Sequence, residues 1–204
     1  MTQTTRRAPR RTQQERSAAM QRRLLDATID ALVEKGYGGT TTLEVQQRAG
    51  VSRGALLHHY TSRADLIVAA VSHLMHVREA EVSALAAAAP NRGRRLDWSV
   101  RVLWSTFEGP LFKAALELWL AARNDPELLA VLLPQERQLG HEIRAMAGEL
   151  FGAKAAQHPA FPESLEMLLD AMRGAAARSV LLAPGAEDRL LTAWIRFMRD
   201  RLKA

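Results

Sequence analysis

Cysteine is absent from the 204-residue sequence, aromatic residues are scarce, and no long apolar run occurs. Without cysteine, disulfide bonds, thiol catalysis and thiolate metal ligands are excluded. No apolar run approaches the roughly 18–20 residues that cross a bilayer, and the basic N-terminal segment lacks the apolar core of a secretory signal. Aromatic residues make up only 5% of the chain whereas alanine and leucine are abundant, which favours helices over strands. We therefore expect a cytoplasmic, helical protein with no membrane partner.

Excess positive charge is confined to the first third of the chain. Residues 1–64 contain eleven Lys or Arg against five Asp or Glu, whereas residues 65–204 contain seventeen of each. The whole net charge of +6 therefore lies in the first segment, which predicts a polyanionic partner for that segment alone. A basic face that only aids solubility is the alternative.

Residues 1–13 contain no acidic residue and are expected to form a disordered basic arm. Such an arm could enter a DNA minor groove, as the flexible arms of other DNA-binding proteins do. The arginines that would do so are Arg6, Arg7, Arg10 and Arg11. A tail that only adds non-specific attraction to DNA is the alternative.

Apolar residues at helical spacing, together with capping residues, predict helices through the rest of the chain, and no segment alternates like a strand. The predicted helices cover residues 15–35, 41–49, 52–60, 62–90, 96–107, 112–123, 126–150, 163–182 and 187–202. Pro134 should kink or divide the seventh of these helices. We expect an all-α fold with one domain at residues 14–64 and a second at residues 65–204.

Residues 41–60 have the pattern of a helix-turn-helix. Thr41 and Glu44 have the spacing of a capping box, in which each side chain bonds the backbone N–H of the other. Gly50 ends this first short helix, and Ser52 is the next N-cap. Two short helices joined by a three-residue turn, with a long helix before them, predict a three-helix DNA-binding domain.

The second short helix has two distinct faces. Leu56 and Tyr60 share one face, whereas Gly54 and His58 share the other, which carries no acidic residue and is rich in hydrogen-bond donors. A face of this kind fits the DNA major groove, and free N–H groups at helix starts can meet phosphates. The candidate DNA-binding residues are Thr41, Thr42, Arg53, Gly54, Ala55, Leu57, His58, His59 and Arg63. An ordinary helical turn with solvated side chains is the alternative.

The segment TTLEVQQRAGVSRGALLHHYTSRADLI resembles the DNA-binding signature of the TetR family of transcriptional regulators. The matching features are the threonine pair, the AGVS turn, a basic residue followed by glycine, the HHY ending, and the DL that opens the next helix. The resemblance implies an all-α homodimer whose N-terminal domain binds a palindromic operator and whose C-terminal domain binds a small effector that releases the DNA. Two positions depart from the family pattern, because Leu57 replaces a usual aromatic residue and Gln46 replaces a usual small one.

Aromatic residues cluster in the middle of the chain. Five of the eleven lie between Trp98 and Trp119, around the predicted helix break at Gly109-Pro110. Such a break can leave an apolar cavity between helices, and the resemblance implies an effector pocket among the middle helices. The candidate residues for binding a largely apolar ligand are Trp104, Phe107, Phe112, Trp119 and Met146. Plain core packing by large side chains is the alternative.

The last two predicted helices are apolar over wide arcs. Small residues around position 175 would let a partner helix approach closely, and large side chains near the C-terminus would serve as anchors. The candidate homodimer residues are Leu169, Met172, Ala176, Val180, Trp194, Phe197 and Met198. The alternative is that both helices only close the core of the monomer.

An enzyme is the competing class, but the motifs GxGxxG, P-loop, GxSxG and HExxH are all absent from the sequence. We therefore expect no catalytic residue, no cofactor and no metal site. A third possibility is an architectural protein that coats DNA without an effector and protects long stretches of it. A repressor that responds to a ligand is the function that the sequence predicts.

Overall fold

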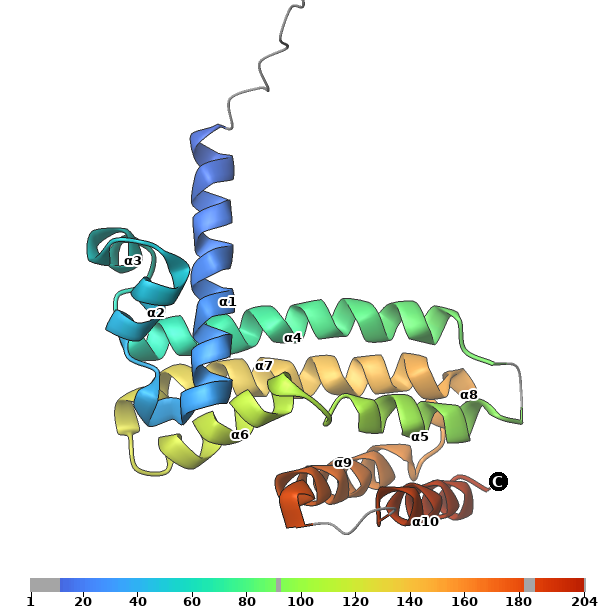
Figure 1. The fold of residues 1–204 in the computed structure, drawn as a ribbon. Coiled ribbons are helices and arrows are strands. Elements are labelled where there is room, and N and C mark those ends of the chain that lie inside the picture. The colour runs from blue at the N-terminus through green and yellow to red at the C-terminus, as the bar shows by residue number, and fades with distance from the viewer. Residues whose placement is uncertain (1–11, 91–92, 182–185, 204) are drawn as a thin grey trace, which may run out of the picture.

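The structure, a computed structural model, describes residues 12–90, 93–181 and 186–203 (Figure 1). Within these ranges every regular element is helical, which confirms the predicted all-α fold. None of these helices combines the length and apolar character that a membrane span requires. The α-helices are α1 (Gln13–Gly39), α2 (Thr42–Ala49), α3 (Arg53–His59), α4 (Arg63–Ala87), α5 (Arg95–Ser105), α6 (Pro110–Ala122), α7 (Pro126–Phe151), α8 (Ala153–Ala156), α9 (Phe161–Ala177) and α10 (Ala186–Arg201). A short 3₁₀ turn, η1 (Ser179–Leu181), follows α9.

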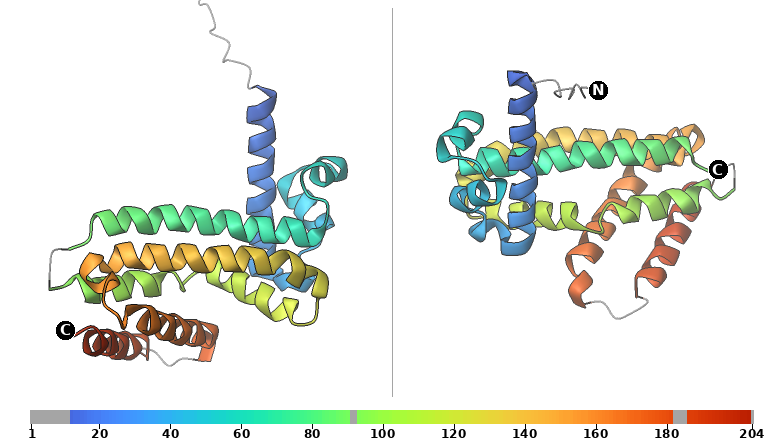
Figure 2. Two further views of the ribbon diagram at one scale, coloured as in Figure 1. Left: turned by 180° about the vertical axis from the view of Figure 1, so that it is seen from behind. Right: turned by 45° about the horizontal axis from the view of Figure 1, so that its top comes forward.

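The long helices α4 and α7 lie side by side along the length of the molecule (Figures 1 and 2). Helices α5 and α6 pack against α7, and α9 and α10 form an outer layer on one side. The C-terminal half of α1 packs across α4 and α6, and α2 and α3 lie beside α1 at the start of α4. The N-terminal part of α1 projects away from the bundle, and residues 12–18 are exposed. This arrangement places α3 at one end of the molecule, on its surface.

The buried side chains form two hydrophobic clusters. The first joins α1–α4 to α6 and the start of α7, and its members Leu32, Leu66 and Leu118 are fully buried. The second joins α5, the end of α7, α9 and α10. Because α6 and α7 complete the first cluster, residues 14–64 share their core with later parts of the chain. The functional division after residue 64 stays a prediction.

Side-chain caps explain why several helix starts could be located from the sequence. Ser52, Ser62 and Asp125 each accept a hydrogen bond from the backbone N–H three residues later, at 3.2, 3.0 and 2.9 Å. Ser62 and Asp65 form a complete capping box at the start of α4. These bonds satisfy N–H groups that have no partner inside the helix, so they depend only on nearby residues.

Two local predictions need correction. Thr41 caps α2 by accepting from the Glu44 N–H at 3.1 Å, but the Glu44 carboxylate binds Lys35 and Arg48, so only half of the predicted capping box forms. Pro134 does not divide the helix as one form of the prediction had it, because α7 continues through it, and a kink there stays a prediction. The packing of α7 along α4 offsets the hydrogen bond that proline removes.

Candidate nucleic-acid interface and ligand cavity

The turn between α2 and α3 decides which face of α3 is exposed. Gly50 adopts the left-handed conformation (φ 63°, ψ 41°), which glycine takes without steric cost, and its N–H bonds carbonyl groups at the end of α2. Leu56 and Tyr60 anchor the inner side of α3 in the first cluster, with exposures of 1% and 7%. The opposite side of α3 therefore faces solvent.

The outward side of α3 carries most of the predicted DNA contacts. The residues that the structure leaves exposed or half-buried there are Arg53, Gly54, Ala55, Leu57, His58 and His59. Nothing lies within 4 Å of the position that a Gly54 Cβ would take, so the backbone is open to close approach. Among the residues that the structure describes, Arg53 forms no ion pair, so its donors are available to an external acceptor.

The start of α2 carries two further predicted DNA-binding residues. Thr41 is exposed, and its hydroxyl oxygen caps α2 while its hydroxyl hydrogen stays free to donate outward. Thr42 beside it is half-buried. Leu43 was not predicted as a surface contact, yet it is 56% exposed and Leu57 on α3 is 47% exposed. Leu57 was predicted at this surface from its helical face, whereas no signal in the sequence indicated Leu43.

Arg63, which was predicted as a DNA contact, binds backbone carbonyl groups of its own chain. Its Nε donates to the Thr40 carbonyl oxygen at 2.7 Å, and its Nη2 donates to the Tyr37 carbonyl oxygen. The guanidinium also lies over the Tyr37 ring, 4.1 Å from the ring centre. These bonds form because the end of α1 leaves carbonyl groups without helical partners, and the start of α4 brings the arginine to them. A DNA contact of Arg63 stays a prediction.

Tyr37 extends this contact to the second half of the chain. Its hydroxyl donates to Asp125 Oδ2 at 3.0 Å, and its backbone N–H donates to Glu117 Oε2 at 3.2 Å. Gly36 allows this approach with a φ of 66°, and a Cβ there would lie only 2.8 Å from Glu117 Oε2. We call Tyr37, Arg63, Glu117 and Asp125 the Tyr37 junction. It connects α1 and α4 with α6 and α7.

Shifted pKa values accompany the bond between Tyr37 and Asp125. Burial raises the pKa of Tyr37, and the bond to Asp125 raises it further. The pKa of Asp125 is lowered first by the Leu128 N–H and then by the Tyr37 hydroxyl. Both shifts keep the phenol protonated and the carboxylate ionised at neutral pH. No sequence signal indicated this contact, because Tyr37 lies 80 and 88 residues from its two carboxylate partners.

Ion pairs hold α2 against α1. Glu44 pairs with Lys35 at 2.8 Å and with Arg48 at 2.6 Å, and Arg48 also reaches Glu34 at 2.7 Å. The bonds from Lys35 and Arg48 lower the pKa of Glu44. The carboxylates of Glu34 and Glu44 are therefore already paired with cations of α1 and α2, and they do not offset the charge of Arg53.

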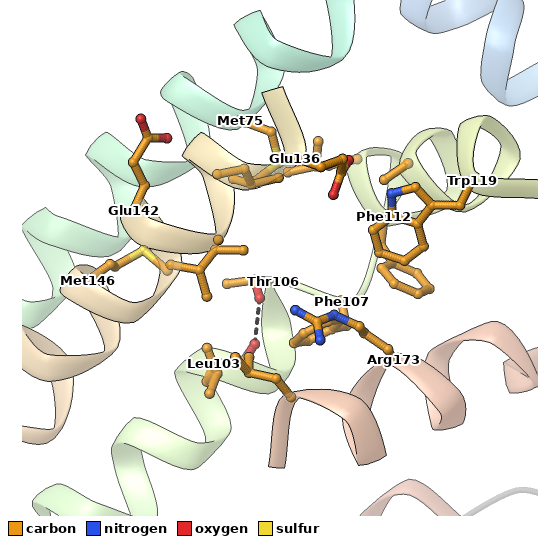
Figure 3. A pocket seen from close by; sticks show the side chains of 16 residues that line it. Met75, Leu103, Thr106, Phe107, Phe112, Trp119, Glu136, Glu142, Met146 and Arg173 are labelled. Carbon is orange, nitrogen blue, oxygen red and sulfur yellow. Dashed lines mark hydrogen bonds between the residues drawn. The ribbon is translucent and has the colours of Figure 1, made fainter. Parts of the chain in front are cut away.

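A cavity of about 120 Å³ lies between α4, α5, α6, α7 and α9 (Figure 3). The predicted pocket residues in its wall are Phe107, Phe112, Trp119 and Met146. Most of the other lining residues are aliphatic. The charged or hydroxyl-bearing ones are Thr106, Glu136, Glu142 and Arg173, and none of them was among the predicted pocket residues. A role for this wall in ligand binding stays a prediction.

Trp104 is the predicted pocket residue that the structure places elsewhere. It is 4% exposed and is not part of the cavity wall. Its ring centre lies 5.1 Å from that of Trp194 and 6.3 Å from that of Phe107. Trp104 is absent from the cavity wall because it lies on the side of α5 that packs against α10, whereas the cavity opens where α5 ends.

Most of the predicted dimer residues are buried within the single chain. Those with at most 9% exposure in the second cluster are Leu169, Met172, Ala176, Trp194 and Met198. A buried side chain leaves no surface for a partner, so these residues are corrected to core positions. Phe197 is half-buried, and the side chain of Val180 lies outside the described residues.

A set of small and apolar residues lies toward the outside of α9 and α10, and two of its members, Leu190 and Phe197, also pack against the second cluster. We call it the outer α9/α10 face, and its exposed or half-buried members are Met167, Ala171, Gly174, Leu190, Ala193 and Phe197. Met167 is 52% exposed, and nothing lies within 4 Å of the position of a Gly174 Cβ. No other described helix covers this outer layer (Figures 1 and 2).

Comparisons with known proteins agree with this fold. Residues 24–70 match the family model of bacterial regulatory proteins, tetR family. An HTH-type transcriptional regulator of Mycobacterium tuberculosis is 30% identical over 180 residues, which cover 88% of this chain and 92% of that protein.

Two solved structures have a similar fold. The multidrug binding protein EbrR complexed with ethidium has a TM-score of 0.60 and 23% identity, with 87% of this chain and 97% of that chain covered. A transcriptional regulator from Saccharomonospora viridis in complex with choline has a TM-score of 0.67 and 16% identity, with 89% and 96% covered. The relatives are regulators or binding proteins rather than enzymes.

Proposed function

Since the chain belongs to the TetR family of bacterial regulatory proteins, we propose that it is a repressor that binds a palindromic operator as a homodimer. A small, largely apolar effector in the cavity would release it from the DNA. Membership of the family makes the chain a transcriptional regulator with a DNA-binding helix-turn-helix. Such a regulator would act in the cytoplasm, where bacterial chromosomal DNA lies.

The outward side of α3 is the observation that carries the DNA-binding part of the proposal. It carries no acidic residue, presents Arg53 and His58 to solvent, and belongs to a single short helix that the major groove can admit. The Thr41 hydroxyl and the N–H groups at the start of α2 would meet phosphates. Leu43 and Leu57 would contact thymine methyl groups or sugars.

Replacing Arg53 with alanine is expected to weaken operator binding and its dependence on salt. Each lost phosphate contact lowers the slope of log affinity against log salt by about 0.9, hence by about 2 for two protomers. Fluorescence anisotropy with an operator duplex obtained by selection from random sequences would measure this slope. Arg101→Ala on α5, an exposed arginine far from α3, is the matched control and should leave the slope unchanged. An unchanged slope in the Arg53 variant would remove Arg53 from the interface.

The outer α9/α10 face supports the homodimer. Its small residues, Ala171, Gly174 and Ala193, would let the helices of a second copy approach closely, and Met167 and Phe197 would fill the remaining space. Two copies are required because one recognition helix reads only a few base pairs. The buried residues first predicted for this role would act indirectly, by holding α9 and α10 in place.

The position of the cavity supports release by an effector. Met75 of α4 lines it, and α4 begins at Arg63, next to the helix-turn-helix. EbrR and the Saccharomonospora viridis regulator hold the small molecules ethidium and choline in proteins of similar fold. A coupling free energy of about 1–3 kcal/mol would lower operator affinity roughly 5–150-fold. Titrating compounds that bind the free protein into the operator complex tests this, and a complex that none of them weakens would contradict it.

An architectural DNA-binding protein without an effector is the alternative. A footprint separates the two functions, because a repressor protects one short symmetric site and a coating protein protects long stretches. Minor-groove contact by the arm also stays a prediction, because its arginines lie outside the described residues: Arg6, Arg7, Arg10 and Arg11.

A further inference from the structure

The charged groups of the cavity are not equivalent. Arg173 extends from α9 into the cavity, but its Nη1 donates to Asp170 Oδ1 at 2.7 Å, so its charge is already partly neutralised. Glu136 of α7 also faces the cavity, and it has no hydrogen-bond or ion-pair partner among the residues that the structure describes. The Glu142 carboxylate points away from the cavity and accepts from Gln138 Nε2 at 2.8 Å (Figure 3).

The rings of Phe112 and Trp119 lie on the same side of the cavity as the Glu136 carboxylate, whereas Phe107 lies beside Arg173 (Figure 3). The ring centres of Phe112 and Trp119 are 6.1 Å apart with an interplanar angle of 82°, and those of Phe107 and Phe112 are 5.4 Å apart at 64°. Aromatic faces carry partial negative charge and attract organic cations, most strongly when water is excluded. The wall therefore offers a free carboxylate and several ring systems to the same ligand.

We propose that the effector is an organic cation, a protonated amine or quaternary ammonium, whose charge lies against Glu136 and whose apolar body packs on Phe112 and Trp119. This inference rests on the proposed effector site and specifies the class of ligand. At about 30 Å³ for each water, the cavity holds about four water molecules, which suits a compact ligand built on one ring.

The other charge classes fit the cavity less well. A neutral ligand would displace water from Glu136 and leave that carboxylate without a partner, which is unfavourable. An anion would compete with Asp170 for Arg173 and would be repelled by Glu136. Only a cation compensates the free carboxylate while leaving the pair of Arg173 and Asp170 intact.

Three probes of similar size test the proposal: benzyltrimethylammonium, its uncharged carbon isostere neopentylbenzene, and the anion phenylacetate. Binding to the full-length protein is measured by calorimetry without DNA. We expect benzyltrimethylammonium to bind about tenfold more tightly than neopentylbenzene. Glu136→Gln should lower the affinity for benzyltrimethylammonium about tenfold and leave the affinity for neopentylbenzene unchanged. Glu142→Gln is the matched control and should change neither affinity.

Several results would overturn the inference. They are equal binding of the cation and its isostere, tighter binding of phenylacetate that is lost in Arg173→Gln, an unchanged cation affinity in Glu136→Gln, and no binding of any probe. Anisotropy of the operator complex is measured separately with the same probes. If the cation binds through Glu136 but does not weaken the operator complex, the proposed release fails while the ligand class stands. If phenylacetate releases the DNA, the proposed release stands while the ligand class fails.

Discussion

Replacing Ala193 with arginine is expected to separate the homodimer and to lower operator affinity by about 10³-fold or more, which is the usual gap between specific and non-specific DNA binding. Ala193 is exposed on the outer α9/α10 face, between Leu190 and Phe197. A long cation there would be buried against the second copy without a partner, and Arg196 on the same helix carries the same charge. A monomer would then bind only one half-site.

Sedimentation velocity would measure the oligomeric state and anisotropy would measure operator affinity. The monomer itself should keep its fold, because position 193 faces solvent in the single chain and arginine is a good helix former. Ala84→Arg on α4 makes the same change at an exposed position away from α9 and α10, and it should remain dimeric. A dimeric Ala193 variant with normal operator affinity would place the dimer contact elsewhere.

Replacing Arg63 with lysine is expected to lower the free energy of unfolding by about 2 kcal/mol even though the charge is kept. The guanidinium donates from two nitrogens to the carbonyl groups of Thr40 and Tyr37, whereas a lysine ammonium cannot reproduce that fork. Thr40 is only 1% exposed, so its carbonyl group has little access to water as a substitute. For a chain of this size the melting temperature should fall by about 4–8 °C.

Operator affinity should fall in the same variant, because Arg63 fixes the start of α4 against the end of α1. Thermal unfolding followed by circular dichroism and anisotropy would give both quantities. Arg53→Lys is the contrasting variant, and it should keep its stability and most of its affinity, because an exposed phosphate contact needs only a positive charge. If Arg63→Lys is as stable as the original and only Arg63→Ala loses affinity, then Arg63 acts on phosphate as the sequence had predicted.

The Tyr37 junction also connects the helix-turn-helix to the cavity. Glu117, which accepts the Tyr37 N–H, lies on α6 together with Phe112 and Trp119 of the cavity wall. Asp125, which accepts the Tyr37 hydroxyl, caps α7, the helix that carries Glu136. A ligand that displaces α6 or α7 would therefore change the contacts of Tyr37, which stacks beneath Arg63.

The sequence by itself determined the features that depend on neighbouring residues. Caps such as Ser52 and Asp125, the helix end at Gly50 and the inward side of α3 were all predicted, because their hydrogen bonds and periodicity involve residues a few positions apart. The helix-turn-helix and its exposed donors follow from these local rules.

Only the tertiary structure decided which helix each buried face meets. Trp104 and Met172 lie on apolar faces, and periodicity shows that such faces are buried but not whether a neighbouring helix, a cavity or a second copy covers them. The partners of Arg63 and Glu136 could not be predicted from the sequence for a related reason. The partner of a charged side chain depends on groups far away in the sequence, and the fold placed two backbone carbonyl groups beside Arg63 and an open cavity beside Glu136.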